Sequence, residues 1–211
     1  MTQSPKYICI EGVIGVGKSD LTKKLGEFLD ARLILDQPKE NPFLVDFYSN
    51  PQRYAFQVQL FFLLSRYRQQ MENLQPSLFH ERTFSDYLFA KDRIFAHLNL
   101  EDRELALYNR VASLLEPDIP KPDLVVYLQS TPEKLMDNIR RKGRTFERDI
   151  SLDYIRSLNE AYNRFFFHFK DAPLLVVNST TIDFDDQNDF TELTEQILRP
   201  HFGIEFFSPA R

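Results

Sequence analysis

Short apolar runs alternate along this chain with longer stretches in which apolar residues recur at helical spacing. The short runs are rich in Ile, Leu and Val, which indicates strands buried on both faces, and they lie at 7–11, 33–35, 77–80, 124–128 and 174–177. The longer stretches predict helices at 19–30, 53–73, 84–98, 101–115, 132–142, 152–169 and 189–198. Such alternation is typical of an α/β fold, so we expect a five-stranded parallel sheet covered by helices on both faces.

Length and composition fit one ordinary globular domain. The 211 residues are 43% apolar and 27% charged, and no linker divides them, so we expect a single domain over 1–211. The net charge of −5 argues against nucleic acid as a partner. A lone cysteine, Cys9, suits a reducing compartment. No run reaches the ~18 apolar residues of a membrane span and no signal peptide is evident, so we expect no membrane partner and a cytoplasmic location.

A complete phosphate-binding motif follows the first predicted strand. The string G-V-I-G-V-G-K-S at 12–19 fits G-x-x-x-x-G-K-[ST] and leads directly into a predicted helix. Gly12, Gly15 and Gly17 allow the backbone to approach a polyphosphate with its amides facing the oxygens. Lys18 is expected to neutralise β- and γ-phosphate oxygens, and Ser19 to offer its hydroxyl to Mg²⁺. The motif therefore predicts a site for a magnesium-bound nucleoside triphosphate.

Other segments distinguish among the classes of protein that carry such a loop. A guanine-nucleotide switch would need D-x-x-G and N-K-x-D segments, and a transporter ATPase would need L-S-G-G-Q, and the sequence contains none of these strings. A compact kinase for a small molecule is the class that remains.

Such a kinase needs a carboxylate near the acceptor oxygen, a carboxylate for the metal, and cations over the transferred group. Asp36 follows the second predicted strand, at the edge where doubly wound sheets bind ligands, and Glu40 is the nearby alternative for the base. The third predicted strand is followed by Glu81 and Arg82, an acid and a base that we expect beside the phosphate loop.

Several ordered segments resemble one family. They are I-E-G-V-I-G-V-G-K-S at 10–19, N-P-F-L-V-D-F-Y at 41–48, Y-A-F-Q-V-Q-L-F-F-L-L-S-R-Y-R at 54–68, E-R-T-F-S-D-Y-L-F-A at 81–90 and R-R-K-G-R-T-F-E at 140–147. Together they resemble the deoxynucleoside kinases, especially the bacterial deoxyadenosine and deoxyguanosine kinases, over residues 6–192. The resemblance implies a P-loop kinase fold with a lid.

The resemblance also implies catalytic and metal-binding roles. Asp36 matches the family's base, which is usually a glutamate, so this chain departs from the pattern by one methylene. Glu81 matches the acid of an E-R-S motif that helps to bind Mg²⁺, and Arg82 matches the arginine beside the phosphates, while Thr83 replaces the usual serine. With Lys18, these residues are the expected catalytic and metal-binding set.

Substrate contacts are implied in the same way. Gln59 matches the glutamine that forms paired hydrogen bonds with the nucleobase, and Arg66 and Asp86 match a polar pair that reads the base edge. Tyr48 and Glu147 match the residues that hold the sugar 3′-hydroxyl, which favours a deoxyribose acceptor.

Donor contacts are implied for two further segments. Residues 140–144 resemble a lid that brings Arg140 and Arg144 over the phosphates, and Asp189 and Phe190 resemble a loop that holds the donor adenine. The family also favours a homodimer.

The function expected from all of this is transfer of the γ-phosphate of ATP, with Mg²⁺, to the 5′-hydroxyl of a deoxynucleoside. A purine or cytosine base is favoured over thymine, and the sequence leaves the choice among adenine, guanine and cytosine open. The alternatives are a nucleoside monophosphate kinase and a non-catalytic nucleotide-binding regulatory module.

Overall fold

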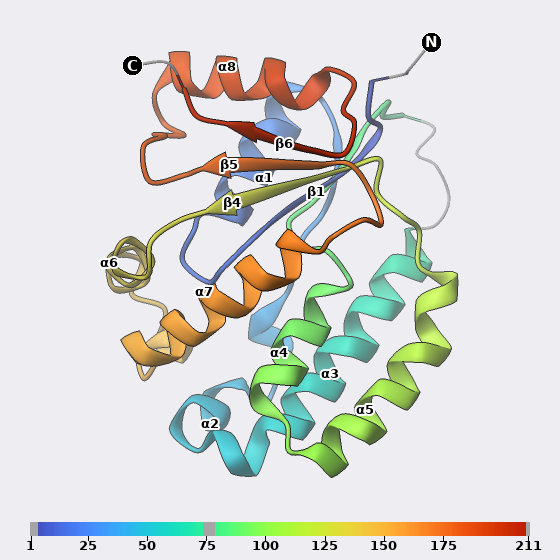
Figure 1. Cartoon of the computed structure of the whole chain (residues 1–211), viewed down its shortest axis with the longest axis vertical. Coiled ribbons are helices and arrows are strands. Elements are labelled where there is room, and N and C mark those ends of the chain that lie inside the picture. The colour runs from blue at the N-terminus through green and yellow to red at the C-terminus, as the bar shows by residue number, and fades with distance from the viewer. Residues whose placement is uncertain (1–3, 74–78, 210–211) are drawn as a thin grey trace.

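The computed structural model describes residues 4–73 and 79–209, and within these ranges it contains one parallel sheet of six strands (Figure 1). The strand order is β2-β3-β1-β4-β5-β6, and every neighbouring pair is parallel. The strands are β1 (Tyr7–Gly12), β2 (Arg32–Ile34), β3 (Thr83–Ser85), β4 (Leu124–Gln129), β5 (Leu174–Asn178) and β6 (Ile204–Phe207). The predicted α/β class is confirmed, with six strands where five were expected.

Helices cover both faces of the sheet. Figure 1 shows α1 and α8 on one side, and α7, α4 and α3 on the other. The helices are α1 (Lys18–Phe28), α2 (Leu44–Ser49), α3 (Pro51–Glu72), α4 (Lys91–Asn99), α5 (Asp102–Leu115), α6 (Pro132–Lys142), α7 (Leu152–Phe167) and α8 (Gln187–Leu198). Short 3-10 turns are η1 (Pro38–Glu40), η2 (Glu116–Asp118) and η3 (Thr145–Glu147).

The helix starts are encoded locally. Thr131 accepts a hydrogen bond from the backbone N–H of Lys134, with Pro132 at the first helical position, and Ser151 caps α7 in the same way. Asp186 caps α8 by accepting from two backbone amides. These caps satisfy amides that have no partner inside the helix.

Two apolar clusters form the core. The larger one packs strands β1, β4 and β5 against α1, α6, α7 and α8, and the smaller one fills the space among α2, α3, α4 and α5. Tyr48 and Tyr154 pack against both clusters. The boundary between the clusters is therefore lined by side chains from the sheet edge and from the helical layer.

The segment around the third strand differs from the prediction. Of the strand expected at 77–80, Ser77 and Leu78 lie outside the described residues, and Phe79 and His80 are not in a strand. The strand is instead Thr83–Ser85, which pairs with β1 through Tyr7 and Thr83, and the helix expected at 84–98 begins only at Lys91. The strand was predicted at a neighbouring apolar run, because the three residues of β3 are too few to show an alternation of apolar and polar positions.

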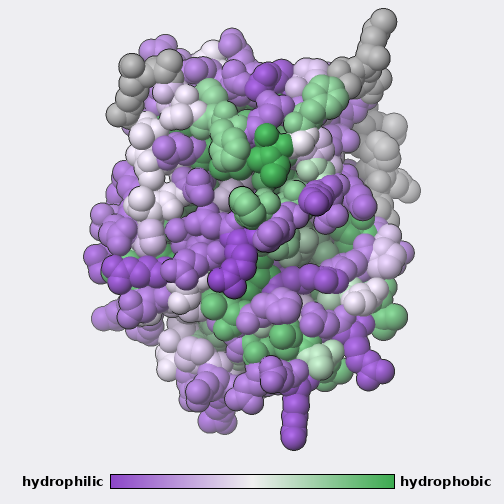
Figure 2. Space-filling view, viewed as in Figure 1, coloured by the Kyte–Doolittle hydropathy of each residue, from purple (hydrophilic) through white to green (hydrophobic). Residues whose placement is uncertain are grey.

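The sequence did not predict the sixth strand, β6. It lies at the edge of the sheet, and its side chains alternate only between exposed and partly buried, so it lacks the apolar run of a buried strand. On the face seen in Figure 2, hydrophobic side chains gather over β5 and β6, where Ile204 and Phe206 are exposed.

Among the described residues, no helix combines the length and hydropathy that crossing a membrane would require.

Candidate active site

The phosphate loop connects β1 to α1, as the sequence predicts. Gly15 has φ of +87°, and a Cβ there would lie 2.6 Å from the carbonyl oxygen of Leu135. Gly17, with φ of +102°, directly precedes α1. Both positions require glycine, so the backbone and not a side chain surrounds the space inside the loop. Lys18 folds back over this space and donates to the carbonyl oxygen of Gly12.

Glu11 anchors the loop from behind. Its Oε1 accepts from the backbone N–H of Gly12 at 2.8 Å, and its Oε2 accepts from the backbone N–H of Leu88 at 2.7 Å. The hydroxyl of Tyr162, on α7, donates to Oε1 at 3.3 Å. One buried carboxylate therefore ties the phosphate loop to the segment that follows β3.

Lys18 is held in an unusual electrostatic environment. Burial, together with the nearby ammonium of Lys91, lowers the pKa of its ammonium to about 8, although Glu11 acts in the opposite direction. A cation that loses water and faces a second cation is stabilised when an anion binds. The loop is thus prepared for a phosphate group.

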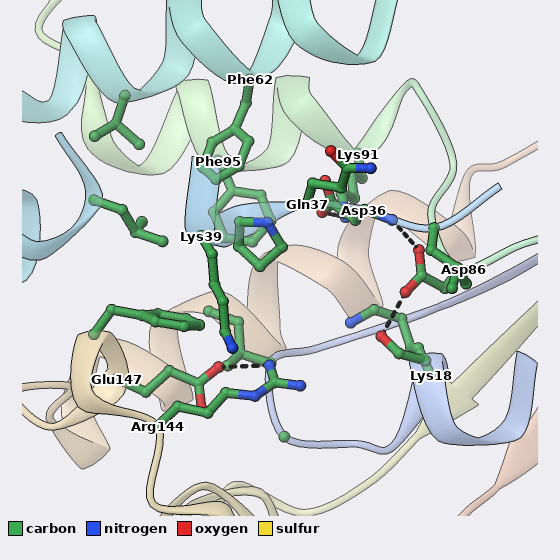
Figure 3. A pocket seen from close by; sticks show the side chains of 18 of the residues that line it. Lys18, Asp36, Gln37, Lys39, Phe62, Asp86, Lys91, Phe95, Arg144 and Glu147 are labelled. Carbon is green, nitrogen blue, oxygen red and sulfur yellow. Dashed lines mark hydrogen bonds and ion pairs between the residues drawn. The ribbon is translucent and has the colours of Figure 1, made fainter. Parts of the chain in front are cut away.

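A cavity of about 530 Å³ extends from this loop to the helical layer (Figure 3). One end is lined by the phosphate loop together with Lys23, Lys142 and Arg144, and we call it the donor end. The other end lies among α2, α3, α4 and α7, and we call it the acceptor end. The acceptor end is lined by Leu44, Phe47, Tyr48, Val58, Gln59, Phe62, Arg66, Asp92, Phe95, Tyr154 and Tyr162.

Asp36 lies on the wall between the two ends. Its carboxylate accepts two hydrogen bonds from Arg66, at 3.1 and 2.6 Å, and one from Lys91 Nζ at 3.0 Å. Burial alone would raise the pKa of this carboxyl, but Arg66 and Lys91 outweigh burial and hold it far below its usual value. Asp36 is therefore ionised at neutral pH. Glu40, the alternative candidate for the base, also lines the cavity.

Asp86 joins the phosphate loop to Asp36. It follows the last residue of β3, and its Oδ2 accepts from the hydroxyl of Ser19. Its Oδ1 accepts from the backbone N–H of Asp36 at 2.6 Å (Figure 3). A hydroxyl and a carboxylate oxygen side by side at a phosphate loop are the hard oxygen ligands that Mg²⁺ prefers.

The polar groups at the acceptor end come from α3 and α4. Arg66 forms an ion pair with Asp92, and its guanidinium lies 4.4 Å from the centroid of the Phe62 ring. Gln59 Oε1 and Asp92 Oδ2 are buried without a hydrogen-bond partner. Unpaired buried acceptors are costly, so both groups indicate a ligand that donates hydrogen bonds. Phe62 and Phe95 line the same space and offer aromatic faces to a flat ring (Figure 3).

Tyr48 and Glu147 meet at the far side of the cavity. Burial raises the pKa of the Tyr48 hydroxyl well above its usual value, and Tyr154 and Glu147 add to the rise. Glu147, on η3, is buried and accepts from Arg144 at 3.1 Å. The structure brings together the pair expected at the sugar hydroxyl, with Arg144 as the partner of Glu147 (Figure 3).

Glu81 and Arg82 do not lie beside the phosphate loop. Both precede β3, whose first residue, Thr83, pairs with Tyr7 at the start of β1, whereas the loop follows the opposite end of β1. The side chain of Glu81 is 69% exposed, and neither residue lines the cavity. The placement expected for this acid and base is therefore wrong, because β3 ends five residues further along the chain than the pattern indicated.

Three residues expected at the donor site also lie outside the cavity. The side chain of Arg140 is 72% exposed and faces Asp137 at 3.9 Å. Asp189 accepts from the backbone N–H of Asp183, which orders the turn before α8. Phe190 is buried in the core, where its ring meets Phe28 edge to face at 5.5 Å. Of the lid residues, Arg144 and Lys142 reach the cavity wall.

Sequence reasoning missed two charged residues of this site, Lys91 and Asp92. Asp86 was expected at the base edge, but it lies against Ser19, and Asp92 is the acid that pairs with Arg66. The sequence did contain a signal for Asp92, because this second acidic residue lies six positions after Asp86, at the start of a helix.

Among the described residues, no group of three or more His, Cys, Asp and Glu side chains is arranged for a metal.

Comparison with known proteins agrees with this geometry. The family model "Deoxynucleoside kinase" matches residues 8–201. Deoxyguanosine kinase of Bacillus subtilis (strain 168) is 32% identical over 184 residues, which cover 86% of this chain and 88% of the relative. Deoxyadenosine kinase of Dictyostelium discoideum is 35% identical over 162 residues, which cover 75% of this chain and 66% of that enzyme.

A solved structure has the same fold. The deoxyadenosine kinase from M. mycoides with bound dATP superimposes with a TM-score of 0.80, at 21% identity, over 91% of this chain and 98% of the other. The family model covers nearly the whole chain, including the phosphate loop. The chain therefore belongs to the deoxynucleoside kinase family.

Proposed function

We propose that this chain transfers the γ-phosphoryl group of ATP to the 5′-hydroxyl of a deoxynucleoside that carries a purine or cytosine base. The observation that carries the proposal is one continuous cavity with a phosphate loop at one end, unpaired hydrogen-bond acceptors at the other, and an ionised carboxylate, Asp36, between them. The family supports the class of reaction, which is phosphoryl transfer to a nucleoside hydroxyl.

Asp36 is the proposed base. The 5′-hydroxyl would lie against this carboxylate, which accepts its proton as the oxygen attacks the γ-phosphorus. Asp36 is shorter than the glutamate of the family pattern, and its contacts with Arg66 and Lys91 fix it at the cavity wall. A carboxylate held in place by two cations loses little entropy on aligning with the acceptor.

The donor end would hold the triphosphate. Lys18 and the loop amides face the β- and γ-phosphates, and Lys142 and Arg144 cover them from the lid. Ser19 and Asp86 are the residues that fit Mg²⁺, and the ion, when bound, would neutralise charge on the β- and γ-oxygens. Asp86 replaces Glu81 in this proposal, because Asp86 is the carboxylate that meets the loop.

The acceptor end would hold the nucleoside. Gln59, Arg66 and Asp92 are the proposed contacts of the base, and Tyr48 and Glu147 those of the sugar 3′-hydroxyl. The unpaired oxygens of Gln59 and Asp92 accept hydrogen bonds, which favours bases that carry an exocyclic amino group. Thymine has no such group, so thymidine is expected to be the poorest of the four substrates.

A nucleoside monophosphate kinase would need a cation to hold the acceptor phosphate. Arg53, in the first turn of α3, lies over the ring of Tyr54 at 5.5 Å and does not line the cavity. Arg66 and Lys91 line the cavity but are paired with Asp92 and Asp36, which favours a neutral sugar alcohol at the acceptor end. A single domain over 1–211 and a cytoplasmic location stay predictions from length, composition and sequence pattern, and a homodimer stays a prediction of the family resemblance.

An ADP-release assay with ATP and Mg²⁺ tests the proposal. The four deoxynucleosides and their 5′-monophosphates are compared at equal concentration. Turnover with deoxyadenosine, deoxyguanosine or deoxycytidine, and little with any monophosphate, is the expected result. Turnover with monophosphates alone would identify a monophosphate kinase, and ATP binding without turnover would identify a regulatory module.

A further inference from the structure

The residue expected to supply positive charge beside the phosphates is not in the site. Arg82 precedes β3, and the residue that follows Asp86 is Tyr87, whose hydroxyl is engaged with Gln69 and Gln70. No arginine therefore follows the acid at the end of this strand. Phosphoryl transfer requires cations around the transferred group, and Lys18, Lys142 and Arg144 supply them from the donor side. The cation on the acceptor side is the one that Arg82 does not supply.

Lys91 and Arg66 are buried cations on the acceptor side of the phosphate loop, and Arg66 is already shared between Asp36 and Asp92. Lys91 is the first residue of α4, and its side chain is 6% exposed and lines the cavity. Its Nζ lies 3.0 Å from Asp36 Oδ2 and 5.4 Å from the centroid of the Tyr87 ring. Figure 3 shows Lys91 beside Asp36 and Asp86 on one wall of the cavity.

Lys91 and Lys18 approach the same space from different elements. Lys18 comes from the phosphate loop and Lys91 from α4, and their charges are close enough to influence each other. Two ammonium groups that face one cavity repel each other, and an anion bound between them offsets this repulsion. The position between Lys18 and Asp36 is where the γ-phosphoryl group would meet the acceptor oxygen.

We propose that Lys91, and not Arg82, is the acceptor-side cation that contacts the transferred phosphoryl group and holds Asp36 toward the 5′-hydroxyl. The inference rests on the proposed function and assigns one further catalytic residue to it. Three observations support this role: Lys91 is buried, it is the first residue of α4, and its ammonium forms an ion pair with the proposed base.

In the reaction, the 5′-oxygen forms a bond to the γ-phosphorus, and the bond from that phosphorus to the β,γ-bridging oxygen breaks. The hydroxyl proton passes to Asp36, and ADP leaves with the electron pair of the broken bond. Lys91 neither gains nor loses a proton in this step. Its ammonium is attracted to the equatorial phosphoryl oxygens as their charge is redistributed.

Steady-state kinetics of Lys91→Met, Lys91→Gln and Lys91→Arg test the proposal, with ATP and the deoxynucleoside varied separately. We expect kcat to fall about 100-fold or more in the two neutral variants, because a lost transition-state cation costs about 10²–10³. KM for the nucleoside should stay within about threefold, and Lys91→Arg should restore kcat to within about tenfold of the wild type.

Two controls separate charge from fold. Arg82→Met removes the cation named by the family motif and should keep kcat within about threefold, and Lys170→Met removes an exposed lysine after α7 and should behave alike. Thermal unfolding of each variant shows which of them fold. If Lys91→Met does not fold, Lys91→Gln, which keeps the polar side chain, carries the comparison.

Three results would overturn the proposal. They are kcat within about threefold of wild type in both neutral variants, a loss in Arg82→Met equal to that in Lys91→Met, or no recovery in Lys91→Arg. A wild-type protein that phosphorylates no deoxynucleoside would instead overturn the proposed function, before any variant is compared.

Discussion

The two ends of the cavity are built differently. The donor end is mainly one contiguous loop whose glycines, lysine and serine lie within residues 12–19. The acceptor end is assembled from single side chains on α2, α3, α4, η3 and α7, which are far apart in the sequence. A local motif specifies backbone geometry and can be recognised by itself, whereas a dispersed site depends on the packing that brings its residues together.

The largest effect is expected at the boundary between the ends. Asp36→Asn keeps the shape of the side chain and removes the proton acceptor, so kcat should fall about 10³-fold or more while the nucleoside still binds. Kinetics and calorimetric binding of the nucleoside measure the two effects. Glu40→Gln is the matched variant, and a loss of turnover there, with Asp36→Asn active, would make Glu40 the base.

A donor-end substitution should affect catalysis and leave the acceptor end intact. In Lys18→Met, kcat/KM for ATP should fall about 10²–10³-fold, because the main cation at the phosphates is gone. The Kd of the deoxynucleoside, measured without ATP, should stay within about threefold of wild type. A large change in that Kd would show that the two ends do not bind independently.

At the acceptor end, two carboxylates six residues apart should separate base recognition from catalysis. Asp92→Asn should raise KM for the deoxynucleoside about 10–100-fold with a small change in kcat, since a hydrogen bond to a charged group is worth ~1.5–3 kcal/mol. Asp86→Asn should instead lower kcat and raise the Mg²⁺ concentration needed for half-maximal rate. A large rise in KM for the deoxynucleoside in Asp86→Asn, and not in Asp92→Asn, would assign base recognition to Asp86.

The smallest expected effect concerns the fold of the donor loop. Gly15→Ala places a Cβ against Leu135 and Ile139 at positive φ, so the free energy of unfolding should fall by about 1–3 kcal/mol. Gly203→Ala is the control, because Gly203 also has positive φ but has no neighbour within 4 Å of the added atom. Denaturant unfolding measures both, and equal losses would leave no role for crowding at Gly15.

The difference between the contiguous donor end and the dispersed acceptor end explains which site residues could be predicted from the sequence. The phosphate loop, Asp36 and the pair Tyr48 and Glu147 reach the cavity as expected, since each follows a strand or lies in a long ordered motif. Glu81 and Arg82 were misplaced because a three-residue strand has too few positions to reveal where it ends. Helix 84–98 was extended over β3 for the same reason.

The aromatic residues show a second limit. Phe62 and Phe95 line the cavity, whereas Phe190 lies in the core, and no periodicity distinguishes a ring that faces a ligand from one that faces other side chains. Lys91 and Asp92 had no motif of their own. The packing of α4 against α3 places Lys91 beside Asp36 and Asp92 beside Arg66, and no local sequence pattern encodes that packing.

Arg66 links the two carboxylates at the acceptor end. Asp92, Arg66, Asp36 and Lys91 form a buried row in which negative and positive charges alternate. A group that hydrogen-bonds to Asp92 would compete with Arg66 for that carboxylate, and Arg66 is also the partner of Asp36. The proposed base contact and the proposed proton acceptor thus share one guanidinium, so part of any change made at Asp92 reaches Asp36 through Arg66.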